Sequence, residues 1–223
     1  MRKALVTTLA FAVSALLATT AVAQLSGPTS EIDYVGYGWE SGGIPTSNPG
    51  DVLDVLAVTT QIDPIFGVDL GTEEVTLYIY GLVSTVEFDL GGGSVLIGYT
   101  GGHIDVYRDA AKDHAWGVFP PNAQLTTFTN GTLMIAGDFT SFSLGMTAQG
   151  AGSYEGLIDG VGGTMANACD GCQYTFGGAF TPDAGTQIPD GYDLQIDGIL
   201  EVLNSVKAHE SSWGAVKSIF GGN

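Results

Sequence analysis

The stretch EVTLYIYGLVSTVEFDLGGGSVLIGYTGGHIDVYRD, residues 74–109, carries the clearest fold signal in the chain. Apolar and polar residues alternate along 85–90 and 103–109, and this period of two is typical of β-strands. Along 74–82 both alternating sets are largely apolar or aromatic, which indicates a strand covered on both faces. The glycines at 91–93 and 101–102 are typical turn residues. The stretch therefore predicts a three-strand antiparallel meander over 84–109, preceded by a covered strand.

Other segments repeat this pattern. Residues 125–137 predict a hairpin turning at Asn130-Gly131, because Asn-Gly is a strong signal for a two-residue turn. Residues 192–202 show the longest alternation, with Leu194, Ile196 and Leu200 on one face. We expect one antiparallel all-β domain over 51–223, either a β-sandwich or a closed barrel of nine to eleven strands. An outer-membrane barrel is a further alternative, but only the segment at 192–203 is long enough for its strands.

Two segments depart from the strand pattern. Residues 24–50 contain several prolines, glycines and asparagines and are predicted to be irregular. Near the C-terminus, Trp213, Val216, Ile219 and Phe220 recur at helical spacing and predict a short helix over about 212–220. Two turns of helix are not stable alone in water, so this helix either docks on the β-domain or serves as an interaction handle.

The first 23 residues have the layout of a secretory signal peptide. Arg2 and Lys3 precede an apolar stretch, and Ala21-Val22-Ala23 forms a small-x-small cleavage site. A buried N-terminal helix is the alternative. We expect cleavage after Ala23 and a secreted, periplasmic or cell-surface protein without a transmembrane helix.

Cys169 and Cys172 are the only cysteines and flank Asp170-Gly171, a favoured turn dipeptide. Paired cysteines of an exported protein usually form a disulfide. We predict a disulfide that clamps this turn and contributes little stability, because the closed loop is very short. Free thiols, a metal site and a redox centre are the alternatives.

The chain has 24 acidic and 6 basic residues and a formal charge of −18. Removal of Arg2 and Lys3 would leave four basic against 24 acidic residues, a charge of −20. Such a charge disfavours nucleic acid as a partner. It is compatible with weak association of calcium or other cations, which we expect to act by screening. The 34 glycines have no fixed period and fall mostly between apolar runs.

The sequence contains no phosphate-binding loop, dinucleotide fingerprint or nucleophile elbow. Asp109, Asp113, His114 and Trp116 form its densest polar and aromatic group. They could ligate a metal or hold a sugar against Trp116, but a solvated loop is the simpler interpretation. We therefore expect no catalytic residue, no metal ligand and no cofactor.

These features favour a non-catalytic, exported, acidic β-protein of the cell envelope or exterior, with a binding or structural role. One alternative is a carrier of small apolar ligands, with a barrel cavity lined by Tyr78, Tyr80 and Tyr99. The other is a secreted hydrolase whose acidic pair cannot be located from the sequence.

Overall fold

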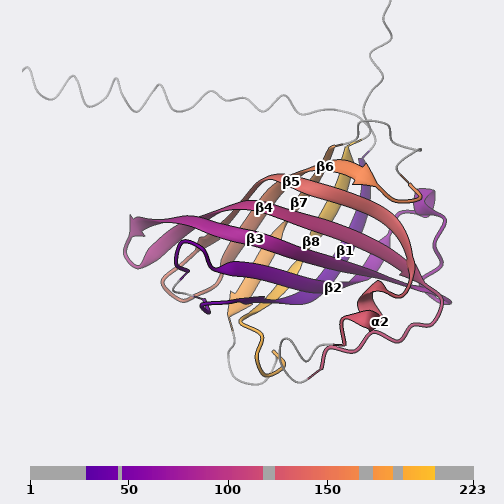
Figure 1. Cartoon of the computed structure of the whole chain (residues 1–223), viewed down its shortest axis with the longest axis horizontal. Coiled ribbons are helices and arrows are strands. Elements are labelled where there is room, and N and C mark those ends of the chain that lie inside the picture. The colour runs from indigo at the N-terminus through magenta and orange to yellow at the C-terminus, as the bar shows by residue number, and fades with distance from the viewer. Residues whose placement is uncertain (1–28, 45–46, 118–123, 166–172, 183–187, 204–223) are drawn as a thin grey trace, which may run out of the picture.

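The computed structural model describes residues 29–44, 47–117, 124–165, 173–182 and 188–203 (Figure 1). Eight strands run through these residues: β1 Thr29–Glu40, β2 Val52–Ile62, β3 Glu74–Gly91, β4 Ser94–Asp109, β5 Thr132–Met146, β6 Gly152–Gly162, β7 Gln173–Pro182 and β8 Leu194–Leu203. The helical pieces are a single 3-10 turn, η1 (Pro64–Phe66), and the four-residue α2 (Thr126–Thr129). No helix in the described ranges is long and apolar enough to span a membrane.

The strands form a closed up-and-down barrel in which each strand pairs antiparallel with the next. The barrel closes where β8 pairs with β1, in a register that runs from Thr29 opposite Leu203 to Gly38 opposite Leu194. The predicted antiparallel all-β class is therefore confirmed, as a barrel rather than a sandwich. The predicted alternation at 192–202 is largely β8, whose Leu194, Ile196 and Leu200 are buried.

The barrel has fewer strands than the predicted nine to eleven, partly because the predicted turn at Gly101-Gly102 and the predicted boundary between the strands 74–82 and 84–90 both lie inside strands. Gly81 in β3 and Gly101-Gly102 in β4 have positive φ angles. They face each other across the β3–β4 pairing, in which Tyr80 opposes His103 and Leu82 opposes Gly101. These glycines bend two long strands together, as β-bulges do, and do not reverse the chain. The predicted three-strand meander is thus one hairpin that turns at Gly91–Gly93.

The prediction that residues 24–50 are irregular is wrong for Thr29–Glu40, which form β1. The strand pattern is hidden because two inward-facing positions, Gly36 and Gly38, have no side chain. A Cβ atom on Gly36 would overlap the backbone of Leu56 and Ala57 on the neighbouring strand. Glycine at this position therefore lets β1 and β2 approach closely, which a glycine count alone does not distinguish from a loop.

The predicted hairpin at Asn130-Gly131 is also wrong. Thr126–Thr129 form α2, and Asn130 keeps a right-handed helical conformation (φ −80°, ψ −10°) as its C-cap. Strand β5 then starts at Thr132 and pairs with β4. Asn130 therefore ends a helical turn and does not occupy a two-residue hairpin turn.

The barrel interior is filled with side chains. Those that are almost completely buried include Ile32, Tyr34, Leu53, Leu77, Ile79, Ile97, Ile104, Phe176, Phe180 and Leu200. The rings of Tyr34 and Phe176 stack at 4.9 Å, and the hydroxyls of Tyr34 and Tyr154 share a hydrogen bond of 2.8 Å. An interior void between Leu53, Phe142, Tyr154 and the side chains around them measures about 10 Å³. This is about the space of one water molecule.

Three predictions concern residues outside the described ranges. They are the signal peptide over 1–23, the disulfide between Cys169 and Cys172, and the C-terminal helix over 212–220. They stay predictions.

Candidate functional site

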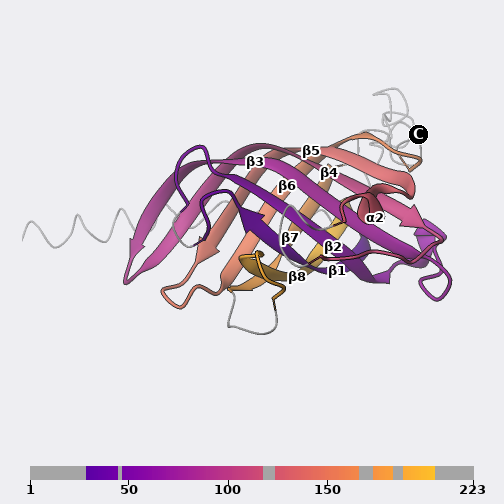
Figure 2. The ribbon, with the colours of Figure 1, turned by 60° about the horizontal axis from the view of Figure 1, so that its bottom comes forward.

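The connection between β4 and β5 covers part of the outer wall of the barrel. We call its described residues, 110–117 and 124–131, the strap; its α2 lies outside the strands (Figure 2). Phe128 of the strap is completely buried, and Thr76 Oγ1 on β3 donates a 2.7 Å hydrogen bond to the Phe128 carbonyl. Leu56 projects from the outer face of β2 and is also fully buried. The strap thus adds a small apolar layer outside the barrel.

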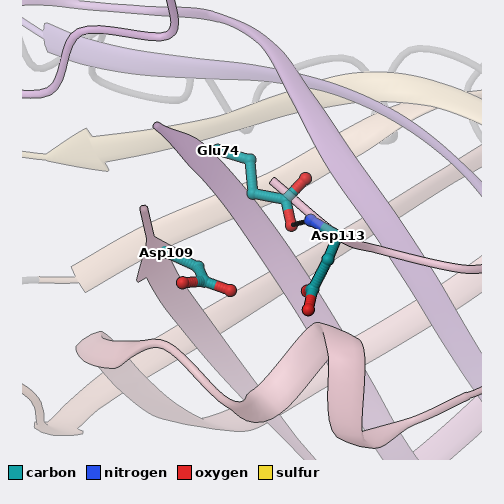
Figure 3. Close-up of side chains that lie close together, drawn as sticks. All are labelled: Glu74, Asp109 and Asp113. Atoms are coloured by element: carbon teal, nitrogen blue, oxygen red, sulfur yellow. Dashed lines mark hydrogen bonds between the residues drawn. The ribbon is translucent and has the colours of Figure 1, made fainter. Parts of the chain in front are cut away.

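Three carboxylates meet where the strap leaves the barrel (Figure 3). Glu74 begins β3, Asp109 ends β4 and Asp113 belongs to the strap, and each offers an oxygen within 4.8 Å of the others. Glu74 and Asp109 lie directly opposite each other in the β3–β4 register. Like charges in this position repel each other, so the arrangement has an energetic cost unless other groups compensate.

Hydrogen-bond donors of the strap compensate the negative charge of Glu74. Its Oε1 accepts hydrogen bonds from the backbone N–H groups of Asp113 (2.9 Å) and His114 (3.1 Å). Its Oε2 lies 2.6 Å from His114 Nδ1. Glu74 is only 4% exposed, so these bonds take the place of water around a buried carboxylate. Its evident role is to fix the start of the strap.

The negative charge of Asp109 is compensated by fewer hydrogen-bond donors. Its Oδ1 accepts a hydrogen bond of 2.9 Å from the Ala111 N–H, whereas Oδ2 is buried and has no partner. Asp113 Oδ1 accepts a hydrogen bond of 3.2 Å from Asn130 Nδ2. Carboxylate oxygens suit hard cations such as calcium and magnesium, so a cation between Asp109, Asp113 and Glu74 would relieve their repulsion.

The aromatic side of the group contributes to packing. The Trp116 ring lies edge-on to Tyr37 at 4.8 Å and tilted against Phe128 at 5.0 Å. Its carbonyl accepts a hydrogen bond of 2.8 Å from the Tyr192 hydroxyl. The structure thus brings the four predicted residues, 109, 113, 114 and 116, into one region, and Trp116 and His114 anchor the strap there.

A second polar group, not found from the sequence, lies at the opposite end of the barrel. Glu40 is 5% exposed and accepts hydrogen bonds from the Tyr99 hydroxyl (2.9 Å) and from Ser47 Oγ. Ser47 lies 2.8 Å from Ser84 Oγ, so the β1–β2 loop is bound to β3 and β4. Burial raises the pKa of Glu40, and the nearby Asp51 and Asp193 raise it further, while the bonds from Ser47 and Tyr99 act in the opposite direction.

The tyrosines expected to line one cavity lie on different faces. Tyr78 and Tyr80 stack at 4.6 Å on the outer wall, whereas Tyr99 points inward and is 6% exposed. His103, expected at the start of a strand, lies within β4 between Asp105 (3.1 Å) and Asp138 (2.6 Å). These side chains therefore do not surround a common ligand site.

Fold and site together define an eight-stranded, up-and-down antiparallel barrel with a packed apolar interior and a cluster of three carboxylates where the strap joins its outer wall. Comparison with family models, curated proteins and solved structures finds no match to the chain.

Proposed function

We propose that this is a non-catalytic, exported β-barrel protein of the cell envelope or exterior, which binds a partner or plays a structural role through its outer surface. The observation that carries the proposal is the packed interior. Ligand pockets usually measure about 300–1,000 Å³. The void of about 10 Å³ at the barrel centre is far smaller, which favours a partner on the outside over an enclosed small ligand.

The polarity of the outer wall also supports a role in aqueous surroundings. Outward-facing positions of β5–β8 are rich in charged and hydroxyl side chains, namely Asp138, Thr140, Ser143, Glu155, Asp159, Thr175, Asp197 and Glu201. A barrel that faces lipid carries its apolar residues on the outside. On these four strands the distribution is the reverse, which favours a β5–β8 wall that faces water.

The β3–β4 tip, residues 85–96, is the surface that best supports a binding role. It extends beyond the other strands in Figures 1 and 2. Phe88 and Leu90 are 54% and 63% exposed on it. Beyond Val83, β3 no longer pairs with β2 in the described part of the chain, so residues 85–91 pair only with β4. An exposed strand edge with apolar side chains can receive another extended chain.

Photo-crosslinking in the producing cell tests this proposal. We expect a crosslinker at position 88 to capture a macromolecule of the envelope or exterior, and the double change Phe88→Ser and Leu90→Ser to abolish capture. The matched control is Ile65→Ser with Val161→Ser, because these side chains are similarly exposed at 66% and 56%. The control should leave capture unchanged. Equal crosslinking from positions 88 and 65, or full retention of capture in the tip variant, would contradict a binding role for the tip.

The export part of the proposal is tested separately. N-terminal sequencing of the protein recovered outside the cytoplasm should begin at Gln24, the residue after the predicted cleavage site. Recovery of the full chain from the cytoplasm alone would contradict export.

A further inference from the structure

A groove of about 550 Å³ crosses the outer wall over β5, β6, β7 and β8. Its most exposed apolar side chains are Leu157 (45% exposed) and Ile199 (39% exposed). Two rows of outward-facing residues lie side by side in it. One row runs from Glu155 through Gly177 to Ile199, and the other from Leu157 through Thr175 to Glu201.

Gly177 helps to make this surface hollow. It lies between Glu155 and Ile199 in its row and has no side chain. The nearest atom to a Cβ placed there is the Tyr154 carbonyl oxygen at 3.5 Å, so the space above the backbone is open. The groove therefore has two apolar side chains, Leu157 and Ile199, and two glutamates, Glu155 and Glu201, on the two sides of the open space at Gly177. This combination suits an apolar segment that also carries positive charge.

We propose that the C-terminal segment of this same chain, residues 204–223, folds back and docks in this groove. The segment follows β8 directly, and β8 supplies Ile199 and Glu201 to the groove. Its sequence carries the apolar stripe Trp213, Val216, Ile219 and Phe220, which must be covered if it forms the predicted helix. The stripe covers Leu157 and Ile199.

The dimensions agree with this arrangement. Ile199 lies four residues before the end of β8, about 13 Å from it at ~3.3 Å per strand residue. Residues 204–212 can span up to roughly 30 Å when extended, which is enough to turn back. A helix over 212–220 is about 13 Å long. Four adjacent strands span about 14 Å between the first and the last axis, so the helix matches the width of β5–β8.

The charges agree as well. After the predicted signal peptide the chain has only four basic residues, Arg108, Lys112, Lys207 and Lys217. Arg108 pairs with Glu73, and Lys112 Nζ donates to the Leu70 carbonyl at 2.7 Å. The other two cations belong to the C-terminal segment, and the groove has Glu155 and Glu201 to receive them. The β3–β4 tip is a poorer place for the segment, because β8 ends at the opposite end of the barrel.

A double-mutant cycle in melting temperature tests the proposal. The two changes are truncation after Leu203 and Ile199→Ser, made singly and together in the chain that lacks its signal peptide. We expect truncation to lower the Tm by about 5–10 °C, and Ile199→Ser to lower it in the full chain but hardly in the truncated one. Val161→Ser, a similar exposed residue outside the groove, should have the same small effect in both backgrounds.

Trp213→Ser in the full-length chain supplies a second test that does not depend on a truncated protein. It should remove most of the Tm effect of Ile199→Ser. An equal effect of Ile199→Ser with and without the segment would overturn the proposal. So would a Tm contribution of the segment that rises with protein concentration, because the segment would then occupy the groove of a second copy.

Discussion

Glu74 and Asp109 lie opposite each other at the ends of β3 and β4, and only Glu74 has hydrogen-bond donors for both of its carboxylate oxygens. The strap provides those donors, so Glu74 is built into its attachment. Asp109 keeps a buried oxygen without a partner. Because of this asymmetry, Asp109 is the least stabilised carboxylate of the pair, and a substitution of Asp109 tests the electrostatic cost of the cluster.

We predict that Asp109→Asn stabilises the protein by ~1 kcal/mol in the absence of divalent cations. The change removes one of three close negative charges, and the new amide can donate to a neighbouring carboxylate. Urea unfolding measures the effect. Asp159→Asn on the exposed outer wall is the control for the change in net charge and should have a smaller effect.

Calcium is predicted to stabilise the protein only weakly and by screening, as expected from the excess of negative charge. Melting curves in calcium and in sodium chloride at matched ionic strength should therefore nearly coincide. A calcium-specific rise in Tm that saturates at micromolar concentration and is lost in Asp109→Asn would refute this prediction. It would identify Glu74, Asp109 and Asp113 as a dedicated cation site.

The close approach of β1 and β2 predicts opposite outcomes for two strand glycines. Gly36→Ala should destabilise the protein by about 2–3 kcal/mol, because its Cβ would overlap the β2 backbone. Gly145→Ala should be neutral or slightly stabilising, since the nearest atom to its Cβ is 3.9 Å away. Chemical denaturation of both variants checks this. Similar losses in the two would show that the packing of β1 against β2 does not require Gly36.

Stability should rise as the pH falls from 7 toward about 4, the ordinary pKa of a carboxyl group in the unfolded chain. Burial raises the pKa values of Glu40, Asp54 and Asp193 above those of the unfolded chain, which are about 4. The folded state then holds protons more tightly, so stability falls as the pH rises from about 4 through the raised pKa values. Glu73 acts in the opposite sense, because a hydrogen bond from Arg108 lowers its pKa, but it lies at the surface.

Glu40→Gln should flatten this pH dependence, because the amide oxygen keeps an acceptor for Tyr99 without a titrating group. Glu87→Gln on the exposed tip changes the net charge equally and should leave most of the slope. Urea unfolding of both variants at pH 5 and pH 7 makes the comparison. Identical slopes in the two variants would attribute the effect to the overall charge and not to the buried Glu40.

The all-β class and the long alternation of β8 follow from the sequence because side chains on a half-buried strand alternate with a period of two. The closure of the barrel does not follow from the sequence. It depends on β1, whose inward positions include Gly36 and Gly38 and so hide the alternation. Gly101-Gly102 and Gly91–Gly93 have the same local conformation with positive φ, and only the pairing with β3 shows that the first pair bends a strand while the second run reverses the chain.

The candidate site was predictable only in its local part. Asp109, Asp113 and His114 are close in sequence, whereas Glu74 reaches them through the register of the β3–β4 hairpin. If 74–109 is treated as one hairpin, counting residues outward from its turn at Gly91–Gly93 pairs Glu74 with a position within two residues of Asp109, its partner in the structure. The group around Glu40 combines residues from β1, the β1–β2 loop, β3 and β4, and no local pattern connects them.

The most direct test of the central claim, that the barrel interior is packed and partners bind outside, is titration with the neutral apolar fluorophore N-phenyl-1-naphthylamine. We predict no saturable binding to the wild-type protein. Phe176→Ala should cost about 3–5 kcal/mol of stability and open a cavity of about the size of benzene, which is too small for the fluorophore, so this variant should not bind it either. The claim would be contradicted, and a carrier favoured, if the wild type bound the fluorophore saturably and this binding changed in Phe176→Ala but not in Leu157→Ala, a variant of the outer groove.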